Sequence, residues 1–479
     1  MAIFRRKTEA ALLILAALVV MVALISLEIS QGNELTGHVF LLIGGFVGIF
    51  LIAHLVISFV APDADQIMLP AVALLNGIGL VMIYRLDLAT GFSLANSQIM
   101  WTVIAVGMMV TVLIFLRDHR SLENYSYLLG LCGLILSALP IVWPKSDLNA
   151  DAAVWITLGP ISIQPGEFAK IMLLLFFATL LVNKRKLFTV AGKSFLGLQF
   201  PRLRDMGPLF LVWGVALVIM ALQNDFGPAL LLFGTVLGML YIATGRASWL
   251  VLGFGLAIIG AVGVYQISAK IQDRVANFVD PVANFHGNGY QLSQALFGMS
   301  WGGVTGTGLG EGYPENVPVA HSDFILAAIG EELGLIGLAG VLLLYVIIAS
   351  RGFNTAMMNR DSYGKLVAGG LSLTLIVQVF VVTGGISRLL PMTGLTTPFL
   401  AHGGSSLLAN YILLAILLRI SHSSRAVMEV SAGGNKWRRH KKKEKDTAAP
   451  NTEDENPHVN RGQTGQGFSG YGEQRGVQA

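Results

Sequence analysis

The sequence predicts an all-α protein that crosses a membrane about twelve times. Of its 479 residues, 54% are hydrophobic and only 13% are charged, and the mean hydropathy is +0.67. So few charged residues cannot cover the surface of a water-soluble chain of this length. The apolar residues also gather into stretches that approach the roughly 20 residues one helix needs to cross the hydrocarbon core.

Twelve apolar stretches follow one another, and each is expected to form a membrane-spanning helix. The first follows Arg5, Arg6 and Lys7, as in a signal peptide, which remains the alternative for this stretch. No cleavage site of small residues follows Leu27, so we expect a retained helix. The sixth and seventh stretches are short, and their helices should extend into flanking residues. The stretches are 10–28, 38–60, 67–84, 98–116, 125–143, 168–182, 208–222, 227–243, 249–268, 324–349, 366–385 and 403–421.

The placement of Lys and Arg predicts that both ends of the chain lie in the cytoplasm, because cytoplasmic loops carry an excess of these residues. With the N-terminus inside, the outer loops hold few basic residues. A basic cluster at 436–443 is typical of a stop signal or of attraction to anionic lipid headgroups, and residues 447–479 are expected to be disordered. Nucleic acid is not expected as a partner. The inner loops hold Arg117, Arg120, Lys184, Arg185, Lys186, Lys193, Arg202, Arg204, Arg246, Arg351, Arg360 and Lys365.

Two long polar segments, 144–167 and 269–323, then face outward. Because no ATP is available there, a reaction on this side needs a substrate that arrives in the membrane already activated. The second segment ends in His321-Ser322-Asp323. A carboxylate at the entrance of a span is costly to keep ionised, which makes Asp323 the leading functional candidate. Adjacent residues cannot form a catalytic relay, so these three are not a triad.

Glu167 and Lys170 lie three residues apart where the sixth span begins, and therefore on one face of the helix. Glu167 also suits the positive end of the helix dipole, and Lys170 can extend its ammonium to the interface. The pair is either a structural ion pair or part of an anion site. The residues alone leave both open.

Two further groups of polar residues lie at or within the spans. Residues 223–228, with Asp225, have the composition of a tight turn. Glu331 and Glu332 follow Asp323 by about 12 Å if a helix starts there. They are expected to be hydrogen-bonded struts, or else proton-relay groups of a transporter.

Glycine marks two more outer sites. The run from Gly302 to Gly312 lacks the preceding strand of a dinucleotide loop and fits a re-entrant turn or close approach to a ligand. Gly403-Gly404-Ser405-Ser406 is expected to cap a helix. The free N–H groups of such a helix start also suit a phosphate.

In combination these motifs resemble those of the SEDS (shape, elongation, division and sporulation) family, the RodA/FtsW peptidoglycan polymerases. Trp155–Lys170 is similar to the family motif W-I-x-L-G…Q-P-S-E-F-A-K, and 223–229 to Q-P-D-L-G-T-A. Gly289-Tyr290-Gln291 with 321–325 is similar to G-Y-Q…H-T-D-F-I. Ala152-Ala153 replace a basic pair, Gly166 replaces Ser, Asn224 replaces Pro, and His402 stands where Tyr is usual.

The resemblance implies a division of the chain into three parts. Residues 1–66 would carry a basic segment and two additional spans, 67–425 the ten-span core, and 426–479 the cytoplasmic tail. The large outward loop then lies between spans nine and ten. The missing basic pair before Trp155 puts a phosphate contact from that loop in doubt.

The resemblance further implies a glycosyltransferase that polymerises lipid II, the undecaprenyl-diphosphate-linked disaccharide pentapeptide, into β-1,4 glycan strands with inversion. Asp323 would be the general base, and Lys170 and Arg274 would stabilise the diphosphate. A divalent cation, Mg²⁺ or Mn²⁺, is left open. Further substrate-contact candidates are Glu167, Gln291, His321 and Ser405.

Two alternatives stay open at this point. One is a lipid II transporter that uses Asp225, Glu331 and Glu332 as intramembrane charges without bond formation. The other is the division-type (FtsW) polymerase. The additional N-terminal spans favour the elongation type (RodA) over it. The resemblance implies a class B penicillin-binding transpeptidase as partner, contact with membrane lipids, and an active site on the outer face of the bacterial cell membrane.

Overall fold

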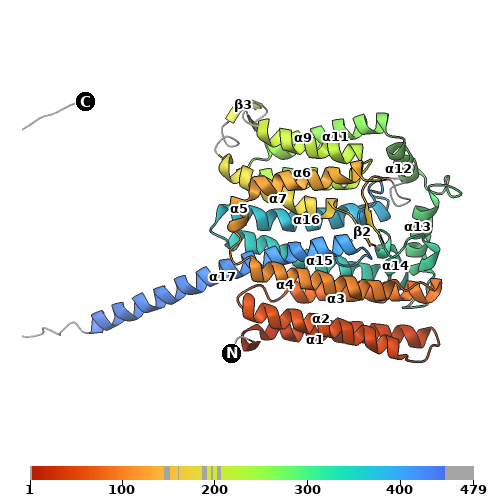
Figure 1. Ribbon diagram of the computed structural model, residues 1–479, viewed down its shortest axis with the longest axis horizontal. Coiled ribbons are helices and arrows are strands. Elements are labelled where there is room, and N and C mark those ends of the chain that lie inside the picture. The colour runs from red at the N-terminus through yellow and green to blue at the C-terminus, as the bar shows by residue number, and fades with distance from the viewer. Residues whose placement is uncertain are drawn as a thin grey trace, which may run out of the picture. The chain divides into compact units, whose positions relative to one another are not determined.

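The fold is a bundle of long helices that run side by side (Figure 1). A computed structural model describes residues 3–144, 152–159, 161–185, 191–195, 198–201 and 207–447. Within these ranges, ten helices are long and apolar enough to cross a membrane, and Ser126–Val142 and Leu209–Leu222 are shorter apolar helices. The expected set of about twelve spans is therefore confirmed.

The spans begin and end close to the predicted positions. The helices of the sixth and seventh predicted spans, Gly166–Asn183 and Gly207–Leu222, extend beyond the apolar stretches 168–182 and 208–222, as expected. Glycines in the left-handed conformation end α3 at Gly91 and α10 at Gly245. The spanning helices are α1 (Lys7–Ser30), α2 (Gly37–Val60), α3 (Met68–Thr90), α4 (Leu94–Phe115), α6 (Ser126–Val142), α7 (Gly166–Asn183), α9 (Gly207–Leu222), α10 (Phe226–Thr244), α11 (Ser248–Ile267), α15 (Gly334–Met358), α16 (Ser362–Ile386) and α17 (Gly404–Thr447), with the short η1 (Ile3–Arg6) before them and α5 (Ser121–Asn124) before α6.

Four helices form the centre of the bundle: α3, α7, α16 and the Gly404–Ala426 part of α17 are mostly buried. The peripheral α1 and α11 present most of their apolar side chains outward, which suits contact with lipid. α16 packs against α7, α10 and α15. Their side chains belong to one continuous hydrophobic core.

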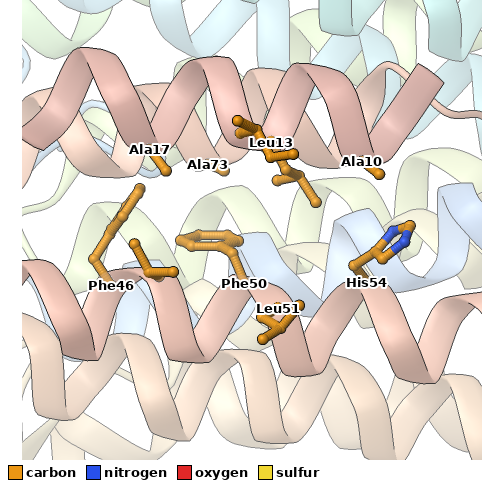
Figure 2. Close-up of a pocket in the computed structure, with 10 residues that line it drawn as sticks. Ala10, Leu13, Ala17, Phe46, Phe50, Leu51, His54 and Ala73 are labelled. Atoms are coloured by element: carbon orange, nitrogen blue, oxygen red, sulfur yellow. The ribbon is translucent and has the colours of Figure 1, made fainter. Parts of the chain in front are cut away.

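The first two helices form an N-terminal hairpin that packs on α3 and α4. Figure 2 shows Leu13 of α1 opposite Phe50 of α2, across a small apolar pocket that Ala73 of α3 also lines. His54 lies at one end of this pocket, and its Nδ1 is 2.6 Å from Glu9 Oε1. The hairpin is therefore held by apolar packing and by a buried polar cluster.

One end of the bundle, at the right of Figure 1, carries the segment between α11 and α15. We call it the site end, and we call the opposite end, where Arg117 and Arg351 lie, the basic end. Residues 269–323 were predicted as a polar loop, but they contain α12 (Ala269–Val279), α13 (Tyr290–Gly302) and η4 (Pro314–Asn316), and α14 (Ile325–Glu332) follows where the predicted tenth span begins. α12 is strongly amphipathic, which explains why no apolar stretch revealed it.

Two short antiparallel strand pairs modify the all-α prediction. β1 (Ile156–Leu158) pairs with β2 (Ile161–Ile163) before α7, with Ile156 opposite Ile163. β3 (Ala191–Phe195) pairs with β4 (Leu198–Pro201). Strands this short carry too few residues for an alternating pattern to be recognised in the sequence.

The predicted continuous span 324–349 is wrong, because the chain breaks between α14 and α15. Leu333 ends α14, and Gly334 has a φ of +65°, in the left-handed region that favours glycine. α15 alone is 25 residues long, enough to cross the membrane. Glu331 and Glu332 consequently lie at the start of the span and not within it.

Residues 1–428 form one compact unit, and 429–479 form a second unit that we describe separately. Helix α17 continues to Thr447. Several predictions concern residues outside the described ranges: the expected disorder of 448–479, the basic residues Lys186, Arg202 and Arg204, and residues 145–151 of the first outer segment.

Candidate functional site

The candidate site lies at the site end, where four segments distant in the sequence meet. Arg274 of α12 reaches the loop between α16 and α17, where its Nη1 donates a hydrogen bond of 3.2 Å to Thr393 O. Backbone N–H of His402, in the same loop, donates to His321 O at 2.8 Å. The segment that ends in Asp323 is thus tied to this loop.

Asp323 is half-buried in the turn before α14. Burial raises the pKa of its carboxyl group above the ordinary value of 3.8, because a low-dielectric surrounding disfavours the charged form. Ser322 Oγ donates to Asp323 Oδ1 at 3.0 Å, and this bond, together with the positive charge of Arg274, opposes the rise. The carboxylate is therefore a base of increased strength, stabilised by one neighbouring cation.

Arg274 acts on a second acid, Asp225, in the turn between α9 and α10. Burial raises the pKa of Asp225 to about 6, while the charges of Lys270 and Arg274 lower it and Glu167 raises it. Lys270 Nζ also donates to Asn224 O at 3.2 Å. Two carboxyl groups and two cations from three segments are thus gathered at the site end.

Asp225 and Lys270 were not predicted as site residues. The turn composition of 223–228 concealed Asp225, and the structure confirms the turn, with Asn224 at a φ of +59°. The signal that could have revealed Lys270 is its position one helical turn before Arg274, on the same face of α12.

Glu167 and Lys170 form a buried ion pair in the first turn of α7. Lys170 Nζ lies 2.6 Å from Glu167 Oε2 and donates to Gln378 Oε1 of α16 at 3.2 Å. Gln378 in turn donates from Nε2 to Thr396 O at 2.8 Å. Of the two predicted alternatives, the structure contains the ion pair, which links α7 to the loop that also holds Arg274.

Gln291 and His321 contact neighbouring protein groups. Gln291 Nε2, at the start of α13, donates to Pro318 O at 2.6 Å and so fixes the backbone three residues before His321. Val319, between them, has a φ of +55°, a conformation that is strained for a β-branched residue. The His321 ring lies edge-on to His402, with centroids 5.7 Å apart. Burial and the neighbouring His321 lower the pKa of His402 to about 4, so this imidazole is neutral at pH 7.

Ser405 is buried at the start of α17. Its Oγ accepts a hydrogen bond of 2.9 Å from Gln164 N, and the next residue, Ser406, accepts one of 2.8 Å from Thr396 Oγ1. The predicted capping residues therefore also join α17 to two loops. Ser405 positions the segment before α7 that carries the Glu167–Lys170 pair.

Glu331 and Glu332 support the glycine-rich loop. Tyr313 N donates to Glu331 Oε1 at 2.7 Å, and Arg85 Nε donates to Glu332 Oε1 at 2.7 Å. Arg85 Nη2 also donates to Gly312 O at 2.7 Å. The structure confirms the expectation of hydrogen-bonded struts, although the two acids lie at the site end.

An apolar groove of about 620 Å³ lies beside the site end of α7 and runs between α4, α6, α7 and α17. Phe168, the neighbour of Glu167, lines it, as do Leu136 of α6 and Phe115 near the end of α4. The groove therefore extends from the first turn of α7 toward the basic end of the bundle.

Comparison with known sequences decides the family. The profile described as "Cell cycle protein", which covers the FtsW, RodA and SpoVE proteins, matches residues 65–426. The chain belongs to this family. The resemblance inferred from the motifs is thereby confirmed. The ten long apolar helices among the described residues, together with the RodA relatives, indicate a multi-pass membrane protein.

Several similar proteins are named peptidoglycan glycosyltransferases. The chain is 48% identical over 432 residues to "Peptidoglycan glycosyltransferase RodA" of Mycobacterium tuberculosis, with 88% of this chain and 91% of that protein covered. It is 47% identical to the protein of the same name from Mycobacterium leprae, with the same coverage. It is 30% identical to the stage V sporulation protein E of Bacillus subtilis, covering 75% of this chain and 98% of that one.

Two solved structures share the fold. A chain of a peptidoglycan synthase complex, described for its coordination of polymerization and crosslinking, is 25% identical, with a TM-score of 0.61 and coverage of 75% of this chain and 98% of that chain. The rod shape determining protein RodA of Thermus thermophilus is 24% identical, with a TM-score of 0.53 and coverage of 75% and 96%, and shows the fold alone.

The sequence left a divalent cation open, which raises the question of a metal site in the described part of the chain. Among the described residues, no three His, Cys, Asp or Glu side chains are close enough together to hold a metal ion. Asp225 and Asp323 are instead balanced by the cationic side chain of Arg274. We therefore derive no catalytic step through a protein-bound cation.

Proposed function

We propose that this chain, a peptidoglycan glycosyltransferase of the RodA type, joins lipid II units into β-1,4 glycan strands with Asp323 as the general base. The glycosyltransferase relatives, 48% identical along most of the chain, support the reaction class. The observation that carries the residue assignment is the position of Asp323 at the site end, half-buried and within the field of Arg274.

The proposed step forms one bond and breaks one. The acceptor sugar hydroxyl attacks the anomeric carbon of the donor from the face opposite the lipid diphosphate. The C1–O bond to the diphosphate breaks, its electron pair leaves with the lipid diphosphate, and the configuration inverts. The hydroxyl proton passes to the carboxylate of Asp323, whose raised pKa makes it a better proton acceptor than an exposed aspartate.

Arg274 and Lys270 are the proposed contacts of the leaving diphosphate. Both lie on one face of α12, and their positive charges already act on Asp225. A cation placed where negative charge develops stabilises the transition state more than the ground state. Lys170, paired with Glu167, fixes the start of α7.

The long lipid of the substrate would lie in the apolar groove between α4, α6, α7 and α17. The groove starts at Phe168, beside Glu167, and its lining is apolar throughout. A donor held there by its hydrocarbon chain would present its diphosphate to the site end. This arrangement explains how a substrate that arrives in the membrane reaches residues above it.

The site end faces outward in this proposal, and both termini lie in the cytoplasm. The basic residues at the opposite end support this orientation, because cytoplasmic loops carry the excess of Lys and Arg. A penicillin-binding transpeptidase of class B is the proposed partner, which would cross-link the new strand. The match to a chain of a peptidoglycan synthase complex supports this pairing. The closer similarity to RodA proteins than to FtsW proteins supports a role in cell elongation.

The test uses the purified full-length chain with lipid II in detergent and no partner protein. Asp323→Asn should lower the rate of glycan formation about 10²- to 10⁴-fold, the range that a general base contributes. Asp280→Asn, on the same outer segment, is the matched control, because its side chain only accepts a bond from Ala283 N. An Asp323→Asn enzyme as active as the control would refute the assignment. Absence of glycan product from the unaltered chain would refute the polymerase function and favour the transporter.

A further inference from the structure

The N-terminal hairpin lies outside the part of the chain that matches the family, yet it contacts the glycine-rich loop beside the site. Gln31 follows the last residue of α1, and its side-chain Nε2 donates a hydrogen bond of 2.5 Å to Gly310 O. Gly310 is buried in the loop between α13 and η4. The contact joins residues 279 positions apart, so it exists only in the folded chain.

The loop is shaped to approach α1 closely. Gly310 has a φ of +89°, and a Cβ at this position would collide with Ser30 Oγ and lie 3.1 Å from both Gln31 Nε2 and Leu27 Cδ1. Glycine is the residue that tolerates both the backbone conformation and the close contact. The close contact between the hairpin and the loop therefore requires a glycine at position 310.

The hairpin that carries Gln31 is itself bound to the rest of the bundle. At the basic end, the buried Arg6 donates to four carbonyl groups of the linker to α3, at 3.2 Å to Ala61 O, 3.1 Å to Pro62 O, 2.8 Å to Ala64 O and 3.1 Å to Asp65 O. At the site end, Tyr84 of α3 donates from its hydroxyl group to the buried carboxylate of Glu28 on α1. The hairpin is thus attached to the linker before α3 at the basic end and to α3 itself at the site end.

On its other side, the loop is bound to α14. Gly310 N donates to Glu332 Oε2 at 3.0 Å, and Gly308 N donates to Glu332 O at 3.0 Å. Thr307 N donates to Glu331 O at 3.0 Å. α14 begins at Ile325, two residues after Asp323. A displacement of the loop therefore acts on α14, the helix that follows the turn with Asp323.

We propose that Gln31 is a positioning residue for the reaction: by holding Gly310 against the N-terminal hairpin, it fixes α14 and with it the carboxylate of Asp323. This inference rests on the proposed function of Asp323. A general base must lie within hydrogen-bond reach of the proton it accepts. Displacements of about 1 Å far from the reacting atoms can lower a rate substantially. The two N-terminal helices thereby hold the glycine-rich loop in place.

The test exchanges the donor at position 31 for an acceptor. Gln31→Glu has the same shape but places a carboxylate oxygen against Gly310 O, whereas Gln31→Lys keeps a nitrogen donor. Asn33→Asp makes the same change of charge two residues later in the same exposed turn and is the matched control. In the full-length protein with lipid II, we expect Gln31→Glu to lower kcat about five- to tenfold with KM unchanged. Gln31→Lys and Asn33→Asp should remain within about twofold of the original enzyme.

A second readout follows the loop itself. Hydrogen exchange of the backbone amides of 304–313 and 319–328 should be faster in Gln31→Glu than in Asn33→Asp, because the loop and the start of α14 are released together. Equal kcat in the two charge variants would overturn the inference, and so would an equal loss in both or a change confined to KM. If the unaltered chain makes no glycan, the proposed function fails. The exchange rates then test whether Gln31 holds the loop, and equal rates in Gln31→Glu and Asn33→Asp would overturn the inference.

Discussion

Lys170 Nζ lies 2.6 Å from Glu167 Oε2 and 3.2 Å from Gln378 Oε1, so one ammonium group joins the first turn of α7 to α16. Both members of the ion pair are buried. A buried charge without its partner is costly, whereas a pair replaced by apolar residues of similar size is often tolerated. The stability of the bundle should therefore depend on the pair as a unit.

Removing one member of this pair should destabilise the protein more than removing both. Lys170→Met leaves Glu167 buried and unpaired, and we expect it to lower the free energy of unfolding by about 3–5 kcal/mol. The double variant Glu167→Leu with Lys170→Met should recover most of that loss. Thermal unfolding of the purified protein in detergent measures both. Equal destabilisation by the single and the double variant would show that the two charges do not compensate each other.

The pH dependence of the reaction should reflect the raised pKa of Asp323. The base must be ionised to accept a proton, so the rate falls on the acid side as pH drops through that pKa, which burial places above the ordinary 3.8. Asp225, with a pKa of about 6, is a second group that titrates there. The acid limb of kcat/KM for lipid II should consequently begin at a higher pH than for an exposed aspartate, and Asp225→Asn separates the two contributions.

Arg274→Gln should move the acid limb to higher pH. The positive charge of Arg274 lowers the pKa of both Asp225 and Asp323, so its loss makes both carboxylates harder to ionise. Arg388→Gln, which removes an exposed cation that binds Phe278 O at 2.8 Å, is the control and should leave the limb in place. An unchanged profile in Arg274→Gln would show that the charge of Arg274 does not influence the ionisation of the proposed base.

Glu331 should be replaceable by an uncharged residue that keeps its acceptor. Glu331→Gln retains an oxygen for Tyr313 N, and polymerisation should stay within about twofold. Glu331→Ala leaves that N–H without its partner and should lower stability by about 1–3 kcal/mol. The measurements are glycan formation and thermal unfolding. A Gln variant as inactive as Asp323→Asn would mean that the carboxylate carries protons, as the transporter hypothesis requires.

Filling the apolar groove should weaken binding of the lipid substrate. Leu136→Trp adds a ring to the lining, and we expect KM for lipid II to rise about fivefold or more with kcat little changed, because the chemistry lies at the site end. Ile135→Trp is the matched control, since the neighbouring Ile135 is 54% exposed and faces away from the packed interior. Equal KM values in the two Trp variants would place the lipid elsewhere.

Much of the fold could be predicted because the length of an apolar stretch is enough to identify a membrane-spanning helix. The spans, the turn at 223–228 and the start of α7 were found where the sequence placed them. The break at Gly334 was missed although Glu331 and Glu332 directly precede it, because the apolar residues resume after them and one left-handed glycine has no mark of its own in hydropathy. Amphipathic α12 was missed for the opposite reason, because a helix at an interface has no long apolar run.

The sequence by itself determined the class of the protein and the order of its spans, and it singled out Asp323 as the candidate base, because each of these depends on local composition or on a residue's place relative to a span. Only the tertiary structure decided which charges meet. It placed Arg274 where its charge acts on both Asp225 and Asp323, paired Lys170 with Glu167, and set Gln31 of the hairpin against Gly310. These partners lie from 3 to 279 residues apart along the chain. Electrostatic and hydrogen-bond energies depend on distance in space, which the packing of the helices sets.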